Sequence, residues 1–140
     1  MLKTIAKAGL CAGVIFLSPL GAAAQTAPDI DFSGLLANCQ SDPLGCSAAL
    51  NAALAEIKLA QATLPPSVVD GLLGSLATVA VAAAQTEPTL GAALGDVIAD
   101  ISETVSEESG VGEQLAEIAE QVSSGGADEV DLTEIGGSPA

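Results

Sequence analysis

The segment PSVVDGLLGSLATVAVAAAQ, residues 66–85, has the clearest periodicity in the chain. Its larger apolar residues recur three and four positions apart, which gathers them on one face of an α-helix. These residues are Val69, Leu72, Leu76, Val79 and Ala83. The uncharged stretch 71–84 inside the segment is shorter than the roughly 20 residues that span a bilayer. The segment therefore predicts a buried helix of a folded domain.

The same spacing predicts helices on both sides of this segment. Ser47 is a candidate N-cap for the preceding helix, which Pro65 ends, and Thr86 with Pro88 marks the start of the following helix. Gly110 separates that helix from the last one. The additional predicted helices cover residues 32–38, 48–63, 88–107 and 112–123. We expect an all-α fold, a small antiparallel bundle rich in alanine and leucine with about four to five helices.

Two pairs of small residues lie four positions apart within the predicted helices. Gly71 and Ser75 form one pair, and Gly91 and Gly95 form the other. Residues at this spacing share a helix face, and small side chains there let two backbones approach closely. The same helices carry acidic residues every few positions, which disfavours contacts inside a membrane. We interpret both pairs as sites of close helix packing within the bundle.

The first 24 residues have the layout of a secretory signal peptide. Lys3 and Lys7 precede an apolar run of about ten residues, and Ala22 and Ala24 form an A-x-A cleavage motif. We expect cleavage near Ala24 and a periplasmic or secreted product. The predicted segments are the signal peptide at 1–24, a helical domain at 25–124 and an acidic tail at 125–140. The charge of the tail and its lack of periodicity predict disorder.

The mature chain is strongly acidic. The whole sequence has a formal net charge of −15, and removal of Lys3 and Lys7 leaves Lys58 against 18 acidic residues, a net charge of 1 − 18 = −17. The sequence contains no arginine and no histidine. One basic side chain cannot neutralise a series of phosphates. The composition therefore excludes direct binding to nucleic acid and electrostatic attraction to an anionic membrane surface.

Cys39 and Cys46 are the cysteines of the mature chain. A structural zinc site needs about four Cys or His ligands, and a thioredoxin-type redox pair has two residues between its cysteines. A catalytic thiol needs a neighbouring base or cation, which histidine and arginine cannot supply here. An exported protein meets an oxidising compartment, where cysteine pairs form disulfides. We expect a Cys39–Cys46 disulfide, with Asp42, Pro43 and Gly45 providing a turn between them.

Common catalytic arrangements are absent from the sequence. Without histidine there is no Ser-His-Asp triad, and no glycine-rich phosphate loop is present. A pair of carboxylates can hydrolyse glycosides, but sugar sites normally also use aromatic side chains, and Phe32 is the only aromatic residue of the mature chain. We therefore expect no enzymatic activity and no cofactor.

Seven acidic residues recur at helical spacing in the last two predicted helices, on stripes away from the apolar faces. No lysine offsets their mutual repulsion. The stripes are either solvated faces or a surface for a basic partner or for divalent cations, with weak Ca²⁺ binding as one option. The tail lacks the spacing and the central glycine of an EF-hand loop. The candidate residues are Asp96, Asp100, Glu103 and Glu107, followed by Glu113, Glu117 and Glu120.

Three functional hypotheses follow from these observations. We favour a small, acidic, exported α-helical protein with a binding role toward a protein partner that the sequence does not identify. One alternative is a structural or self-assembling envelope protein, in which the closely packing helices meet between chains. The other is a protein that responds to divalent cations through its acidic helix faces.

Overall fold

Residues 28–133 and residue 135 are described in the computed structural model of the chain. This part of the chain is all-α, with five α-helices and no β-strand. The α-helices are α2 (Phe32–Ser41), α3 (Pro43–Ala60), α4 (Pro66–Thr86), α5 (Gly91–Thr104) and α6 (Val111–Ser123). Three short 3₁₀-helices accompany them: η1 (Pro88–Leu90), η2 (Glu107–Ser109) and η3 (Ala127–Glu129). The predicted signal peptide, residues 1–24, lies outside the described residues.

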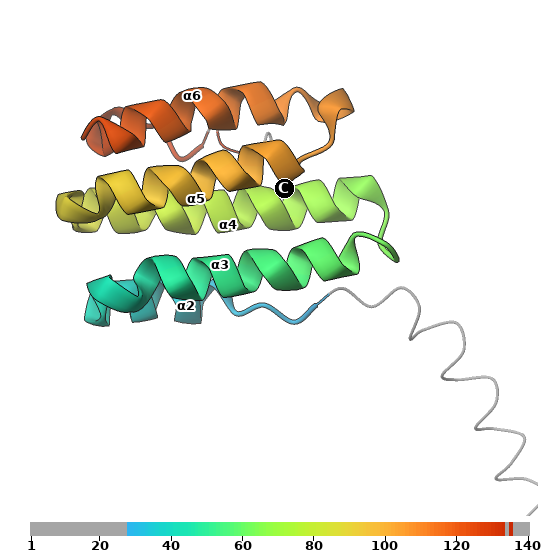
Figure 1. Ribbon diagram of the computed structural model, residues 1–140, viewed down its shortest axis with the longest axis horizontal. Coiled ribbons are helices and arrows are strands. Elements are labelled where there is room, and N and C mark those ends of the chain that lie inside the picture. Colours follow the sequence, from blue (N-terminus) through green and yellow to red (C-terminus); the bar gives the residue numbers. More distant parts are fainter. Residues whose placement is uncertain (1–27, 134, 136–140) are drawn as a thin grey trace, which may run out of the picture.

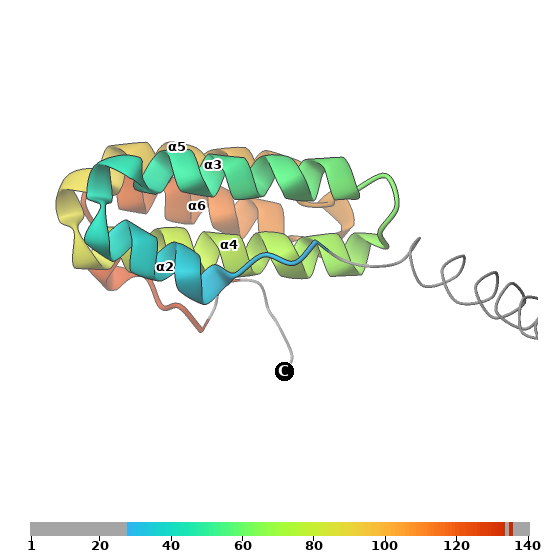
Figure 2. The ribbon, with the colours of Figure 1, turned by 90° about the horizontal axis from the view of Figure 1, so that it is seen from below.

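Consecutive helices run antiparallel and lie along one common direction (Figure 1). The α2–α3 hairpin lies on one side of the bundle, and α6 lies on the opposite side against α5 (Figures 1 and 2). Between them, α4 contacts α2, α3, α5 and α6. The prediction of an all-α antiparallel bundle is confirmed for the described residues.

α4 is the central helix of the core. The residues of its predicted apolar face are buried, apart from Leu72, which is partly buried. Neighbouring helices also cover residues outside that face, such as Leu73 and Val81. By length and composition alone α4 is also suited to cross a membrane, but 56% of its apolar window is buried inside the bundle. Central core helices share that composition because they are covered on most sides.

The corner between α2 and α3 differs from the predicted loop. α2 continues to Ser41 and α3 starts at Pro43, so Asp42 alone connects the two helices. Asp42, and not the predicted Ser47, is the N-cap of α3, and its side chain accepts the Gly45 N–H at 3.3 Å. Aspartate at the N-cap followed by proline at the first helical position is a strong start signal. The residues predicted to form a turn therefore begin a helix.

The predicted disulfide is present at this corner. Cys39, near the end of α2, is bonded to Cys46, near the start of α3, with their Cα atoms 4.4 Å apart. Both side chains are buried at the edge of the core. The bond therefore joins the two helices of the hairpin directly beside the apolar interior.

The predicted helix at 88–107 is divided into three elements. η1 comes first and has Glu87 as its N-cap, while the predicted cap Thr86 is the last residue of α4. α5 then ends before Val105, whose backbone is extended. Glu107 consequently lies in η2 and is not on the helix that carries the other acidic residues of this segment.

The two predicted pairs of small residues behave differently. Gly91 and Gly95 face α6, and a Cβ at Gly95 would lie 2.9 Å from the carbonyl oxygen of Ala119. This pair allows close approach of α5 and α6, as predicted. The prediction for Gly71 and Ser75 is wrong, because Ser75 is exposed and a Cβ at Gly71 would meet nothing within 4 Å. Spacing alone does not show which face of a helix is covered.

Residues 125–133 and residue 135 of the predicted acidic tail are described in the structure, and the disorder expected for the tail stays a prediction. η3 packs against α4 and α6, and the side chains of Ala127 and Val130 are buried. The Gln85 amide Nε2 donates to the carbonyl oxygens of Ala127 at 2.9 Å and Val130 at 3.1 Å. One polar side chain of α4 and two apolar residues thus hold this segment on the bundle. Residues 134 and 136–140 lie outside the described part.

Candidate functional site

The acidic residues of the predicted stripes are all exposed. Asp96, Asp100 and Glu103 lie on α5, and α6 carries Glu113, Glu117 and Glu120. Glu107 lies in η2, between the two helices. α5 and α6 form the most extensive helix pair in the structure, so the two sets of carboxylates lie on neighbouring helices. We call these seven exposed carboxylates and the surface between them the α5–α6 acidic surface.

A shallow groove follows the contact between α5 and α6. It encloses about 580 Å³ and has Gly95, Ala99 and Ala119 among its lining residues. The close helix approach at Gly91 and Gly95 keeps the floor of the groove free of large side chains. Carboxylates from both helices contribute to its lining, at Asp96, Glu103 and Glu120. The groove is therefore a strip of small residues, alanine, glycine and serine, with acidic side chains along it.

A second hollow, of about 520 Å³, lies where α5 leads into α6. Glu103, Glu107 and Glu113 line it together with Val105 and Gly110. Glu103 lines both hollows, so the negative charge extends from the groove to the end of the bundle. The stripe residues Asp100 and Glu117 line neither hollow.

The predicted cation ligands are not gathered into a metal centre. Among residues 28–133 and 135, no group of three or more Asp, Glu, Cys or His side chains is placed to hold a metal ion. A protein Ca²⁺ site takes six to eight oxygen ligands, so spread carboxylates do not make one. Cation binding by Asp96, Asp100, Glu103, Glu107, Glu113, Glu117 and Glu120 stays a prediction, and the geometry of the described residues does not favour it.

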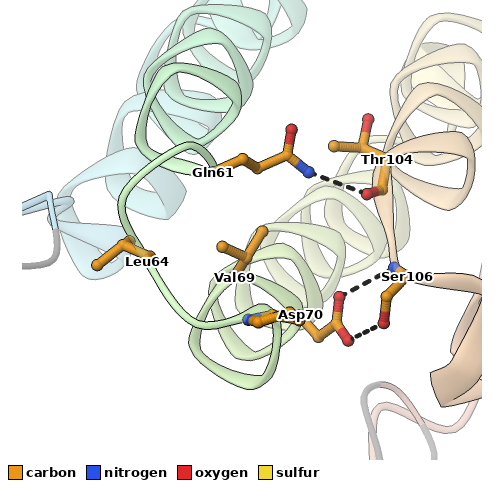
Figure 3. A pocket seen from close by; sticks show the side chains of 7 residues that line it. Gln61, Leu64, Val69, Asp70, Thr104 and Ser106 are labelled. Carbon is orange, nitrogen blue, oxygen red and sulfur yellow. Dashed lines mark hydrogen bonds between the residues drawn. The ribbon is translucent and has the colours of Figure 1, made fainter.

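A third hollow contains the best-defined polar cluster of the described residues (Figure 3). It encloses about 180 Å³ at the end of the bundle where the α3–α4 connection meets the end of α5. The carboxylate of Asp70 accepts the Ser106 N–H at 3.1 Å and the Ser106 hydroxyl at 2.5 Å. The Gln61 amide Nε2 donates to the carbonyl oxygen of Thr104 at 3.2 Å. Leu64 and Val69 supply the apolar part of the lining, as Figure 3 shows.

Each polar group in this cluster has a structural role. Asp70 is partly buried and satisfies the N-cap residue of η2, and Gln61 satisfies a carbonyl at the last residue of α5. Both oxygens of the Asp70 carboxylate accept from Ser106, so neither is aimed into the hollow as an unsatisfied group. The cluster fixes the end of α5. Sequence analysis missed it because Asp70 and Ser106 are 36 residues apart and no pattern links them.

The chain matches no protein-family model, no curated protein and no solved structure. Its function is therefore inferred from its own residues and their arrangement.

Proposed function

We propose that the protein is an exported, non-catalytic interaction protein that binds a cationic protein partner through the α5–α6 acidic surface. The observation that carries this proposal is the exposure of seven carboxylates on the adjoining elements α5, η2 and α6 of a chain with no basic residue after Lys58. Each exposed carboxylate keeps its hydration and adds to the negative potential of this surface. Such a potential attracts cationic partners and raises their association rate.

The groove supports a partner with basic side chains on an extended or helical backbone. Its small-residue floor accepts the aliphatic stems of lysine or arginine, and Asp96, Glu103 and Glu120 lie within the same lining. Long basic side chains place their stems on apolar surface and their charges in water beside such acids. A partner of this kind also relieves the repulsion among the carboxylates, which the chain itself does not relieve.

Export is part of the proposal. The signal-peptide layout of residues 1–24 supports it, and a buried disulfide is typical of proteins from oxidising compartments. We expect the intact mass of the exported form to correspond to a chain that begins near Gln25. An unprocessed chain in the soluble cytoplasmic fraction would contradict export without affecting the acidic surface.

A binding experiment with a matched control tests the surface. The probe is a fluorescent lysine-rich peptide, and its affinity is measured by anisotropy at several salt concentrations. We compare Glu103→Gln/Glu120→Gln with Asp29→Asn/Asp128→Asn, which removes the same charge from exposed sites outside the surface. Two exposed ion pairs contribute about 0.2–1 kcal/mol each, so we expect the first variant to bind about two- to thirtyfold more weakly.

The control and the salt series decide the outcome. Affinity should fall as salt rises, because exposed charges are screened beyond a Debye length of about 8 Å near physiological ionic strength. Equal losses in the two double variants would mean that net charge alone attracts the peptide, which would contradict a defined site. Calcium added at matched ionic strength tests the cation hypothesis separately. If the surface contains a specific cation site, calcium should weaken peptide binding more than sodium does.

A further inference from the structure

α3 has an exposed apolar face on its outer side. Leu44 is 91% exposed and Leu59 is 80% exposed, and these two are the most exposed large apolar side chains of the described residues. Ala48, Asn51 and Ala55 lie between them and are also exposed, so one polar amide interrupts the apolar residues. The five residues are spaced by four, three, four and four positions, so they share one face over almost the whole length of α3. We call this the α3 face.

The α3 face itself contains no charged residue. Within α3 the charged residues are Glu56 and Lys58, both exposed. Being two positions apart, they point to opposite flanks of the face and do not reach each other. α6, with its carboxylates, lies on the far side of the bundle from the α2–α3 hairpin (Figures 1 and 2). A second copy can thus approach α3 while the carboxylates of α6 stay on the far side of the bundle, whereas α5, which carries the other carboxylates of the acidic surface, contacts α3.

We infer that the α3 face binds a second copy of this chain, with the two α3 helices side by side and parallel about a two-fold axis. Leu44 then packs on Leu44 of the second copy, and Leu59 packs on Leu59. The alanines between them permit close approach of the two backbones, as small residues do at helix contacts. This interface is on a different face from the proposed partner site and does not depend on it.

Charge complementarity favours a second copy as the partner of the α3 face and determines the relative direction of the two α3 helices. In the parallel arrangement the flank with Lys58 meets the flank with Glu56 of the second copy, and the two-fold axis produces this ion pair twice. An antiparallel arrangement places the two Lys58 flanks on the same side and the two Glu56 flanks on the other, so no opposite charges meet. Charges on the flanks of a helix seam set partner and orientation in this way in coiled coils.

The size of the face sets the expected strength. A contact one helix wide belongs at the low end of specific interfaces, below about 1,200 Å² in total. The like net charge of two copies opposes association, and salt screens that opposition. We therefore expect a weak dimer that grows with protein concentration and with moderate salt, which is opposite to the salt dependence of peptide binding at the α5–α6 acidic surface.

The first test removes the apolar contact. Sedimentation velocity of the processed chain over a range of concentrations should show a monomer–dimer equilibrium. Leu44→Asn/Leu59→Asn should remain monomeric, whereas Val68→Asn should dimerise like the parent, because Val68 is an exposed apolar residue of α4 outside the face. Circular dichroism melts verify that the variants are folded. A folded parent that stays monomeric at all concentrations overturns the proposal, as does a double variant that still dimerises.

The second test reverses the charges. Glu56→Lys makes the net charge less negative, so nonspecific repulsion falls, yet it leaves two positive side chains facing each other across the interface. We expect it to weaken dimerisation about two- to tenfold, and Lys58→Glu to do the same. The double exchange Glu56→Lys/Lys58→Glu restores the pairs and should restore the dimer. Stronger association of Glu56→Lys, or no recovery in the double exchange, contradicts the parallel pairing.

Discussion

The carboxylate of Asp70, near the start of α4, accepts both the backbone N–H and the hydroxyl of Ser106, 36 residues later in the chain. Ser106 is the N-cap residue of η2, immediately after the extended residue that ends α5. The Gln61 amide binds the last carbonyl of α5 beside it. The end of α5 is thus fixed by side chains from the α3–α4 region, and this position also sets the direction in which the chain enters α6.

Asp70→Asn should destabilise the fold. The amide oxygen of asparagine accepts less strongly than a carboxylate and replaces only one of its two oxygens. Hydrogen bonds to charged groups contribute about 1.5–3 kcal/mol each, so we expect a loss of about 1–3 kcal/mol in the free energy of unfolding, measured with urea. Asp96→Asn removes the same charge from an exposed position and serves as the control. Equal stabilities of the two variants would mean that the Asp70–Ser106 bonds contribute nothing.

Gly95→Ala tests the contact between α5 and α6. Its Cβ would overlap the Ser123 hydroxyl, which can rotate, and would lie 2.9 Å from the Ala119 carbonyl oxygen, which is backbone. Overpacking of this kind costs about 1–3 kcal/mol, which at the lower end of that range only cancels the gain of about 1 kcal/mol from replacing glycine in a helix. We therefore compare it with Gly71→Ala, which takes the propensity gain without any contact. The free energy of unfolding of Gly95→Ala, measured with urea, should be about 1–3 kcal/mol lower than that of Gly71→Ala.

The disulfide should account for a large share of the stability of this small domain. The chain-entropy model assigns about 2.5 kcal/mol to closing a loop of eight residues. We expect Cys39→Ala/Cys46→Ala to lose at least that amount in urea unfolding, since both side chains are also buried. A reducing agent should destabilise the parent and leave the double variant unchanged. A parent that is insensitive to reduction under unfolding conditions would contradict the bond.

The sequence predicts the helices of this protein better than their ends and contacts. The range predicted for α4 is correct within one residue, because a central helix combines strong periodicity with proline at its start. The α2–α3 corner was mispredicted because Asp42-Pro43 has the composition of a turn as well as of a helix start. Only the surrounding packing separates these two interpretations, since the disulfide and Asp42 together hold the helices on either side.

The candidate site was partly predictable for the same reason. Helical spacing places the acidic residues of α5 and α6 on exposed faces, but only the fold shows that the two helices that carry them are neighbours. Glu107 is not on the same helix as the rest of its predicted stripe, because α5 ends before Val105. The α3 face was not predicted at all, because the sequence does not distinguish an exposed leucine such as Leu44 from a buried one. Exposure is a property of the whole fold.

Thr133→Val should raise the pKa of Asp131. The Thr133 hydroxyl donates to the Asp131 carboxylate at 2.7 Å and the Thr133 N–H at 2.9 Å, and these bonds hold the pKa of Asp131 below its ordinary value. Because the folded-state pKa of Asp131 is lowered in the parent protein, its folded state binds fewer protons than its unfolded state. The resulting stabilisation is present above the unfolded pKa and is lost as pH falls through the folded pKa. NMR titration of the side chain measures the shift, and an unchanged pKa in Thr133→Val would exclude the hydroxyl as its cause.

Gln85→Ala should release the segment 126–131 from the bundle and leave the helices in place. The Gln85 amide donates to the carbonyl oxygens of Ala127 and Val130, which lie more than 40 residues later in the chain. Losing these bonds leaves two carbonyls without their partner, at a cost of about 1–3 kcal/mol to the local contact. Stability is not uniform across a fold, so this cost appears as local opening before global unfolding.

Hydrogen exchange measured by mass spectrometry distinguishes local opening of the segment from global unfolding. In Gln85→Ala the amides of residues 126–131 should exchange about 5- to 150-fold faster, as 1–3 kcal/mol predicts, while the core of α4 keeps its protection. Gln114→Ala is the control, because Gln114 is an exposed glutamine of α6. If the segment exchanges rapidly in the parent as well, the burial of Ala127 and Val130 does not hold it, and the disorder predicted from its charge is correct. If α4 loses protection together with the segment, the two form one cooperative unit, and Gln85 stabilises the whole bundle.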